Sequence, residues 1–151
     1  MSNHRSIWQA ANMAWLVSEA RVLASAEVAG DRASRRKGLL KQDSFEGALV
    51  IQPCRWIHTI GMRFPIDVAY LDADGVVIKT IKMHRHRMGI PVSRARSVIE
   101  AEAGAFSRWG LRVGDLVEVR TDDEARPDPP APTTHDTQSD MQHRPAENPG
   151  A

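Results

Sequence analysis

One hairpin signal constrains this chain more than any other stretch. Residues 66–71 are rich in β-branched and aromatic side chains, and they follow Pro65, which favours an extended backbone in the residue before it. The run 72–75, Asp-Ala-Asp-Gly, is typical of a turn, and a second apolar run follows at 76–83. The sequence therefore predicts two antiparallel strands joined by a tight turn, in a fold dominated by β-structure.

Further short strands are predicted on both sides of this hairpin. We expect them at 15–17, 22–28, 47–51, 97–101 and 116–119. Two short helices are expected at 31–40, where Asp31 is a good N-cap, and at 104–111. Six or seven short strands with two short helices indicate a mostly β (α+β) fold, a small single-domain barrel or sandwich.

The composition changes after residue 121. Residues 122–151 contain seven acidic and two basic side chains, six of the nine prolines, and no Val, Ile, Leu or aromatic residue. Such a segment cannot bury enough apolar surface to offset the entropy lost on ordering. We therefore predict a flexible N-terminal arm at 1–12, one β-rich domain at 13–121, and a disordered, acidic, proline-rich tail at 122–151.

Cysteine content and the absence of long apolar runs limit the compartment and the partners. The single cysteine excludes an internal disulfide and a metal site made of cysteines alone. No apolar run resembles a signal peptide at the start of the chain, and none has the length of a membrane span. We expect a soluble cytoplasmic protein with no membrane partner. The oligomeric state does not follow from the sequence.

The segment 54–62, just before the hairpin, is the best candidate for a functional surface. It mixes bulky apolar and hydrogen-bonding side chains and follows neither helical nor strand periodicity. Irregular backbone that leads into a rigid strand is a common place for binding groups. We expect this segment, the loop 84–89 and the helix carrying Arg35 to form a groove.

Arginine, histidine and apolar side chains together suit a small anionic ligand or a carboxylate-bearing peptide. We therefore expect a non-enzymatic binding or accessory module. The predicted ligand-binding residues are Arg35, Trp56, His58, Thr59, Met62, Arg63, Asp67, His84 and His86. The adjoining run 35–37, Arg-Arg-Lys, is expected to be a solvated face.

A small hydrolase that uses His58 or Asp67 is the main alternative. Cys54 lies four residues before His58, and such a pair can activate a thiol. Asp67 lies inside an apolar strand, where a carboxylate needs partners. We expect Asp67 to accept hydrogen bonds from backbone amides or from Thr59, or to pair with an arginine such as Arg35 or Arg63. For Glu100, too, both a structural and a catalytic role stay open. No catalytic residue is assigned.

The basic loop 82–87 raises two further possibilities. It could contact phosphates as a weak nucleic-acid binder, but no aromatic side chain for base stacking lies beside it. His84 and His86 could share one strand face and form a metal site with another ligand such as His58 or Cys54. Their spacing is not a usual ligand pattern, and the loop arginines would repel a cation. We expect no metal and no cofactor.

The chain contains an ordered set of motifs: Arg35-x-x-Gly38-Leu39-Leu40, Gly47-Ala48-Leu49, 65–77, Glu100-x-x-x-Gly104 and Gly110-Leu111-x-Val113-Gly114-Asp115. In this order they resemble a known family, the domain of unknown function one-nine-two, or "uncharacterised ACR" proteins. The resemblance covers about residues 15–120. It implies a single β-rich domain with short helices, and it implies no chemistry. Where many members carry Phe-Trp-Met-x-Asn-Thr, this chain has His58 at the tryptophan position and Gly61 at the asparagine position.

Overall fold

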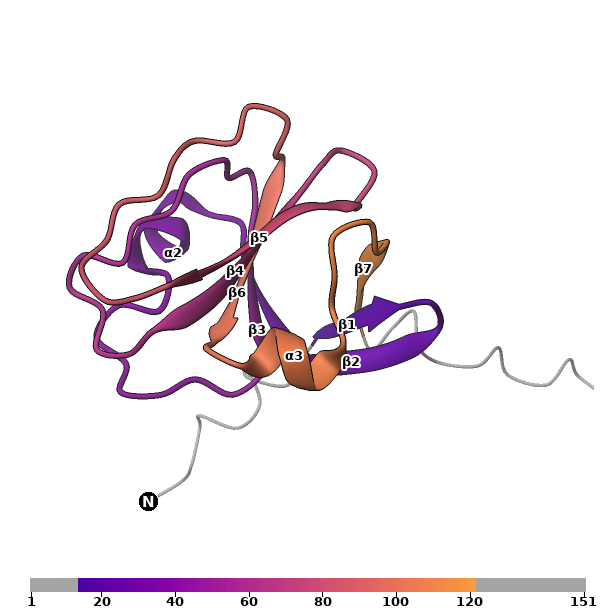
Figure 1. Ribbon diagram of the computed structural model, residues 1–151, viewed down its shortest axis with the longest axis horizontal. Helices are drawn as coiled ribbons and strands as arrows, with labels where there is room; N and C mark the ends of the chain where they lie inside the picture. Colours follow the sequence, from indigo (N-terminus) through magenta and orange to yellow (C-terminus); the bar gives the residue numbers. More distant parts are fainter. Residues whose placement is uncertain (1–13, 122–151) are drawn as a thin grey trace, which may run out of the picture.

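A computed structural model describes residues 14–121, which form a seven-stranded mixed β-sheet with two short helices (Figure 1). The predicted arm at 1–12 and tail at 122–151 lie outside the described residues. Within 14–121, no helix is long and apolar enough to cross a membrane. The strands are β1 (Ala14–Ser18), β2 (Arg21–Ala29), β3 (Ala48–Ile51), β4 (Ile66–Leu71), β5 (Val77–Met83), β6 (Ser97–Glu102) and β7 (Val117–Thr121), and the helices are α2 (Arg32–Lys37) and α3 (Ala105–Trp109).

The strand order across the sheet is β5-β4-β6-β3-β2-β1-β7. Strands β2 and β3 are parallel, and the other neighbouring pairs are antiparallel. Near the two outer strands, Val76 and Leu116 form an isolated bridge, and the amides of Val77 and Val117 donate to the carbonyls of Asp115 and Gly75 at 2.9 Å each. The predicted mostly β (α+β) fold is confirmed, and the sheet is not closed into a barrel.

The predicted hairpin at 66–83 is formed by β4 and β5, with Ile66 opposite Met83. Its turn is held by Asp72, whose Oδ1 accepts the amides of Asp74 at 2.9 Å and Val76 at 3.0 Å. Gly75 has a φ angle of 83°, a conformation that glycine adopts without steric cost. The turn sequence therefore determines the local backbone.

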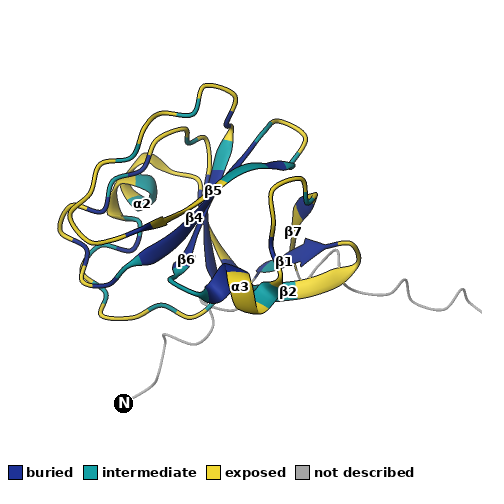
Figure 2. Cartoon of the chain, viewed as in Figure 1, coloured by how far each residue is buried: buried dark blue, intermediate teal, exposed yellow. Residues whose placement is uncertain are grey.

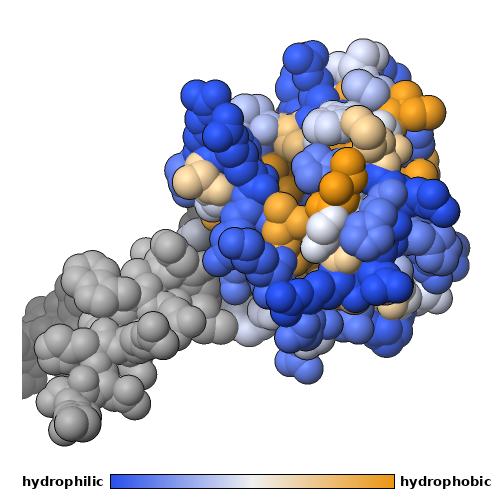
Figure 3. Space-filling view, turned by 90° about the vertical axis from the view of Figure 1, so that its left-hand side faces the viewer, coloured by the Kyte–Doolittle hydropathy of each residue, from blue (hydrophilic) through white to orange (hydrophobic). Residues whose placement is uncertain are grey.

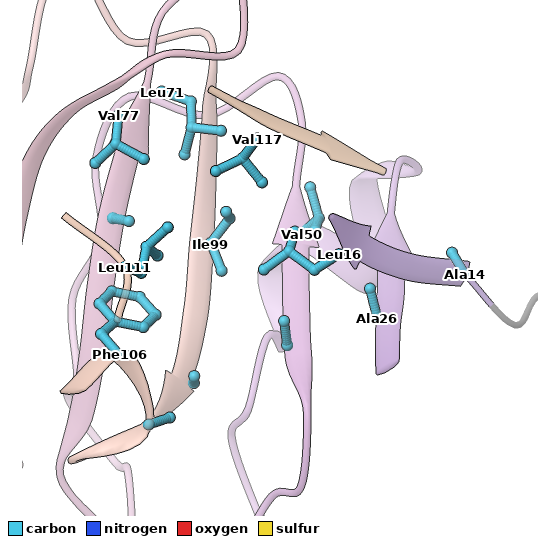
Figure 4. Packing of buried hydrophobic residues seen from close by; sticks show 14 residues of the cluster. Ala14, Leu16, Ala26, Val50, Leu71, Val77, Ile99, Phe106, Leu111 and Val117 are labelled. Carbon is cyan, nitrogen blue, oxygen red and sulfur yellow. The ribbon is translucent and has the colours of Figure 1, made fainter. Parts of the chain in front are cut away.

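Both faces of the central strands are covered. All six residues of β4 are buried, and β4 and β6 are dark blue over most of their length in Figure 2. On the side of α3, Phe106 and Leu111 pack over Ile99 and Val77 (Figure 4). The opposite side of the sheet carries a second core cluster, which lies beneath α2 and the segment 53–64 and which we call the α2-side core. Because strand side chains alternate, neighbouring residues of β4 and β6 enter different cores.

Helix α2 is shorter than predicted. Asp31 caps its start, since Oδ1 accepts the amides of Ala33 and Ser34 at 2.9 Å each. The helix ends at Lys37 because Gly38 turns the chain with φ 45° and ψ −133°. Leu39 then inserts into the α2-side core instead of extending the helix to residue 40.

Candidate functional site

A pocket of about 290 Å³ lies where α2, the segment 53–62 and the α2-side face of the sheet meet. Its cationic residues all come from α2, and apolar residues from several segments form much of the wall. Figure 3 views this side of the molecule, where apolar residues gather in a central area surrounded by hydrophilic ones. The cationic residues are Arg32, Arg35, Arg36 and Lys37, and the apolar ones include Leu39, Leu40, Ile51, Ile57 and Met62.

The basic side of the pocket is held in place by local bonds. The Arg35 guanidinium donates to the carbonyl of Gly30 and, at 3.5 Å, to the carbonyl of Gln52, which follows β3. The neighbouring Arg36 and Lys37 are exposed. The run 35–37 was predicted to be a solvated face; Arg36 and Lys37 are solvated, but the run also lines a concave site.

The segment 53–62 supplies the polar wall. The indole Nε1 of Trp56 donates to the carbonyl of Gly89 at 2.9 Å, and the Trp56 and His58 rings lie 5.4 Å apart. His58 Nδ1 accepts the amide of Ile60 at 3.3 Å, while the ring is half-buried. These bonds fix the indole and the imidazole at the edge of the pocket.

Cys54 is also a wall residue, but it does not resemble a nucleophile. Its thiol donates to the carbonyl of Trp56 at 3.3 Å. Burial raises the pKa of the Cys54 thiol, and the nearby Glu100 raises it further, more than the backbone hydrogen bond and Arg35 lower it. Reactive cysteines need a lowered pKa, so the environment here opposes thiol catalysis.

Glu100 is the acidic residue of the pocket. It lies on the central strand β6 between Leu49 and Val68 of the neighbouring strands, and only 5% of it is exposed. Its Oε2 has no hydrogen-bond partner within 14–121, and a Cβ added to Gly38 would lie 3.4 Å from this oxygen. Burial raises the pKa of Glu100 to about 7. This carboxyl therefore exchanges its proton near neutral pH.

Asp67 lies elsewhere, away from His58, although the sequence predicted both as ligand-binding residues. Its Oδ2 accepts the amides of Gly104 at 2.8 Å and Phe106 at 3.1 Å on the α3 side of the sheet. The expected bonds from backbone amides are confirmed, whereas Thr59 and the arginines are not its partners. Asp67 is not a wall residue of the pocket that contains His58.

The remaining predicted residues divide among different locations. Thr59 is fully buried; its hydroxyl donates to the carbonyl of His84 at 2.6 Å and accepts the amide of Arg87 at 2.9 Å. Arg63 pairs with Asp43 at 2.8 Å on the surface. Thr59 therefore has an architectural role, since it ties the segment 53–62 to the loop 84–87.

The loop 84–87 borders a separate depression, together with Pro65. Within this loop, His86 Nδ1 accepts the amide of Gly61 at 3.2 Å. The predicted groove is therefore not continuous, because this loop is not part of the pocket wall beside α2. No group of three His, Cys, Asp or Glu side chains in the described range could hold a metal ion. The predicted residues that the pocket does bring together are Arg35, Trp56, His58 and Met62.

Sequence reasoning assigned no binding role to Glu100 or to the other cations of α2. A charged residue inside the apolar run 97–101 was the available signal for Glu100, since a buried strand position rarely carries an unpaired charge. Its position in the pocket depends on Gly38, which lies far away in the sequence. The contact between them could not be inferred from local pattern.

The described part of the chain is thus a small β-rich domain with a cation-lined pocket on one face of an open sheet. The chain belongs to the DUF192 family, described as Uncharacterized ACR, whose model matches residues 15–119. No curated protein matches the chain.

Two solved structures are similar to it. One is a protein of unknown function from Novosphingobium aromaticivorans, with a TM-score of 0.60 and 19% identity, covering 70% of this chain and 83% of that one. The other is a putative transcription regulator from Sinorhizobium meliloti, with a TM-score of 0.60 and 21% identity, covering 72% of this chain and 92% of that one. At these identities the similarity supports the fold alone.

Proposed function

We propose that this chain is a non-enzymatic binding module whose pocket takes a small organic anion with an apolar body. The observation that carries the proposal is the convergence of four α2 cations and an apolar wall on one pocket of about 290 Å³. This volume lies at the lower end of the range for ligand sites. The occupant is therefore a small molecule or the end of a peptide.

The charges of α2 support an anionic ligand. Arg32, Arg36 and Lys37 are exposed, and Arg35 is fixed by two carbonyls, so an anion meets one preorganised guanidinium and three mobile cations. None of these four has an acidic partner among the ion pairs of the described residues. Their charges are consequently free to act on a ligand.

The hydrolase alternative receives less support. Asp67 is used by two backbone amides on the other side of the sheet, and the thiol of Cys54 is held in its neutral form by burial. His58 alone offers no paired nucleophile. Binding without chemistry is the simpler use of the site.

The test uses 3-phenylpropanoate, an apolar ring with one carboxylate, and its neutral amide, 3-phenylpropanamide. We expect the acid to bind and, because Trp56 lines the pocket, to quench part of the emission of the four tryptophans, and the amide to bind at least tenfold more weakly. The double variant Arg36→Gln/Lys37→Gln should weaken binding of the acid about three- to tenfold, since exposed charge pairs contribute about 0.2–1 kcal/mol each.

The matched control removes two cations from the other depression, with Arg85→Gln/Arg87→Gln. We expect this double variant to bind 3-phenylpropanoate like the wild type. If both double variants lost the same affinity for 3-phenylpropanoate, the effect would be one of overall charge. If the acid and the amide bound equally tightly, the pocket would not be an anion site. If the loop 84–87 variant instead abolished binding of a short single-stranded oligonucleotide, the nucleic-acid alternative would gain support.

A further inference from the structure

The pocket combines two opposite electrostatic features. Its α2 side carries four cations, while Glu100, which is more than nine-tenths buried, presents an unpartnered carboxyl to the same space. An anionic ligand satisfies the cations and leaves the carboxyl without a donor. A buried polar group without a partner is costly, so its persistence calls for an explanation.

We infer that the ligand is an amino-acid-type zwitterion with an apolar side chain, whose carboxylate lies with the α2 cations and whose ammonium group donates to the Glu100 carboxylate. This inference rests on the proposed function and narrows its ligand class. An ammonium group supplies donors and a countercharge together, which a buried carboxylate requires. The apolar wall, with Leu39 and Met62 among its residues, accommodates the side chain.

The other groups that face Glu100 do not supply this countercharge. Cys54 and Tyr70 lie close enough to interact with it electrostatically, and the pKa of both is raised chiefly by burial, so both are neutral near pH 7. Arg35 is directed to two backbone carbonyls, and no hydrogen bond links any α2 side chain to Glu100. The pocket therefore offers one acidic group to a ligand, since its other wall residues are basic, neutral or apolar.

Proton release distinguishes a zwitterion from a simple anion. An ammonium group beside Glu100 favours the ionised carboxyl and lowers its pKa from about 7, so that binding at pH 7 expels the proton from the molecules that still carry it, about half of them. An anion without the ammonium group has the opposite effect and causes proton uptake. The matched control is Glu102→Gln, which removes a carboxyl from the same strand but outside the pocket wall.

The experiment compares L-phenylalanine with 3-phenylpropanoate, which shares the ring and carboxylate but lacks the ammonium group. Calorimetry at pH 7 in phosphate and in Tris gives the affinity and the number of protons exchanged. We expect the wild type to bind phenylalanine at least tenfold more tightly and to release up to about half a proton per ligand, since about half of the Glu100 carboxyls are protonated at pH 7. Glu100→Gln, which keeps the size of the side chain, should lose both the preference and the release, while Glu102→Gln, on the same strand but outside the pocket wall, should keep both.

The outcomes separate the two proposals. If 3-phenylpropanoate binds as tightly as phenylalanine, or if the preference survives in Glu100→Gln, the zwitterion inference is wrong while the anion site stands. If neither compound binds the wild type, the anion-binding function and the zwitterion inference both fail. Circular dichroism of Glu100→Gln checks that the variant is folded before its affinity is compared.

Discussion

Two buried carboxylates, Asp67 and Glu100, lie on adjacent central strands and face opposite sides of the sheet. In the register of β4 and β6, Asp67 is opposite Ala101 and Glu100 is opposite Val68. Both are almost fully covered, with 7% and 5% exposed. Asp67 accepts two backbone amides, whereas the Oε2 of Glu100 has no partner among the described residues.

The difference comes from what the chain places above each strand. On one side the start of α3 presents the free amides of Gly104 and Phe106, and the carboxylate of Asp67 satisfies them. On the other side Gly38, which follows α2, presents no donor to Glu100, and a pocket opens instead. A satisfied carboxylate stabilises the fold, while an unsatisfied one beside a pocket is a candidate for function.

The largest expected effect is the loss of Asp67. Asp67→Leu should lower the free energy of unfolding by about 2–4 kcal/mol, because two buried amides lose their charged acceptor. Asp67→Asn keeps one acceptor oxygen and should cost about 1–2 kcal/mol. Urea unfolding of the wild type and both variants measures these values. If Asp67→Leu were as stable as the wild type, the hydrogen bonds from the start of α3 to Asp67 would contribute little to stability. Asp67 could then no longer serve as the stabilising carboxylate with which Glu100 is compared.

The second prediction concerns the pH dependence that Glu100 imposes. Its pKa rises from 4.5 to about 7 on folding, so the unfolded chain loses this proton first as the pH increases. The contribution of Glu100 to the free energy of unfolding is therefore favourable below about pH 4.5, falls as the pH rises, and is fully lost above about pH 7. The total change in this free energy is about 3 kcal/mol. Urea unfolding at pH 4.5, 6 and 8 should show this fall in the wild type relative to Glu100→Gln. Parallel profiles for the two proteins would mean that Glu100 has a partner in solution.

The third prediction is a substitution that should stabilise the fold, whereas Asp67→Leu should destabilise it. Glu100→Leu places an apolar side chain between Leu49 and Val68 in the α2-side core, and it removes the buried carboxyl. We expect it to raise the free energy of unfolding by about 1–2 kcal/mol at pH 8 and to change it less at pH 5. The same variant should lose ligand binding. A destabilised Glu100→Leu would indicate that the carboxyl makes a stabilising contact through water.

Sequence reasoning was most successful where local chemistry determines structure. The turn at 72–75, the capping residue Asp31 and the alternation around Asp67 predicted the hairpin, the start of α2 and a tied carboxylate. These features depend on residues a few positions apart, or on a rule that buried polar groups obey anywhere. Hence they could be inferred without knowing the strand order.

The site was predicted less well because it depends on long-range placement. Parallel pairing of β2 with β3 brings α2 over the sheet, and this crossover puts Gly38 against Glu100. The bond between Thr59 and the carbonyl of His84 likewise fixes the loop 84–87 against the segment 53–62 and away from the pocket. Neither arrangement has a signal in the spacing of nearby residues, so the predicted groove combined two separate concavities.

The smallest expected effect comes from a third carboxylate, which provides the exposed reference for the other two. Asp43 pairs with Arg63 at 2.8 Å, but the two side chains are 85% and 54% exposed. Water and salt screen such a pair, so Asp43→Asn should change the free energy of unfolding by less than about 0.5 kcal/mol, and less still in 0.5 M NaCl. Urea unfolding at low and high salt measures both values. A cost near that of Asp67→Asn would mean that an ion pair at the surface matters as much as two buried amide bonds, and burial would no longer explain why the two central carboxylates differ from the rest.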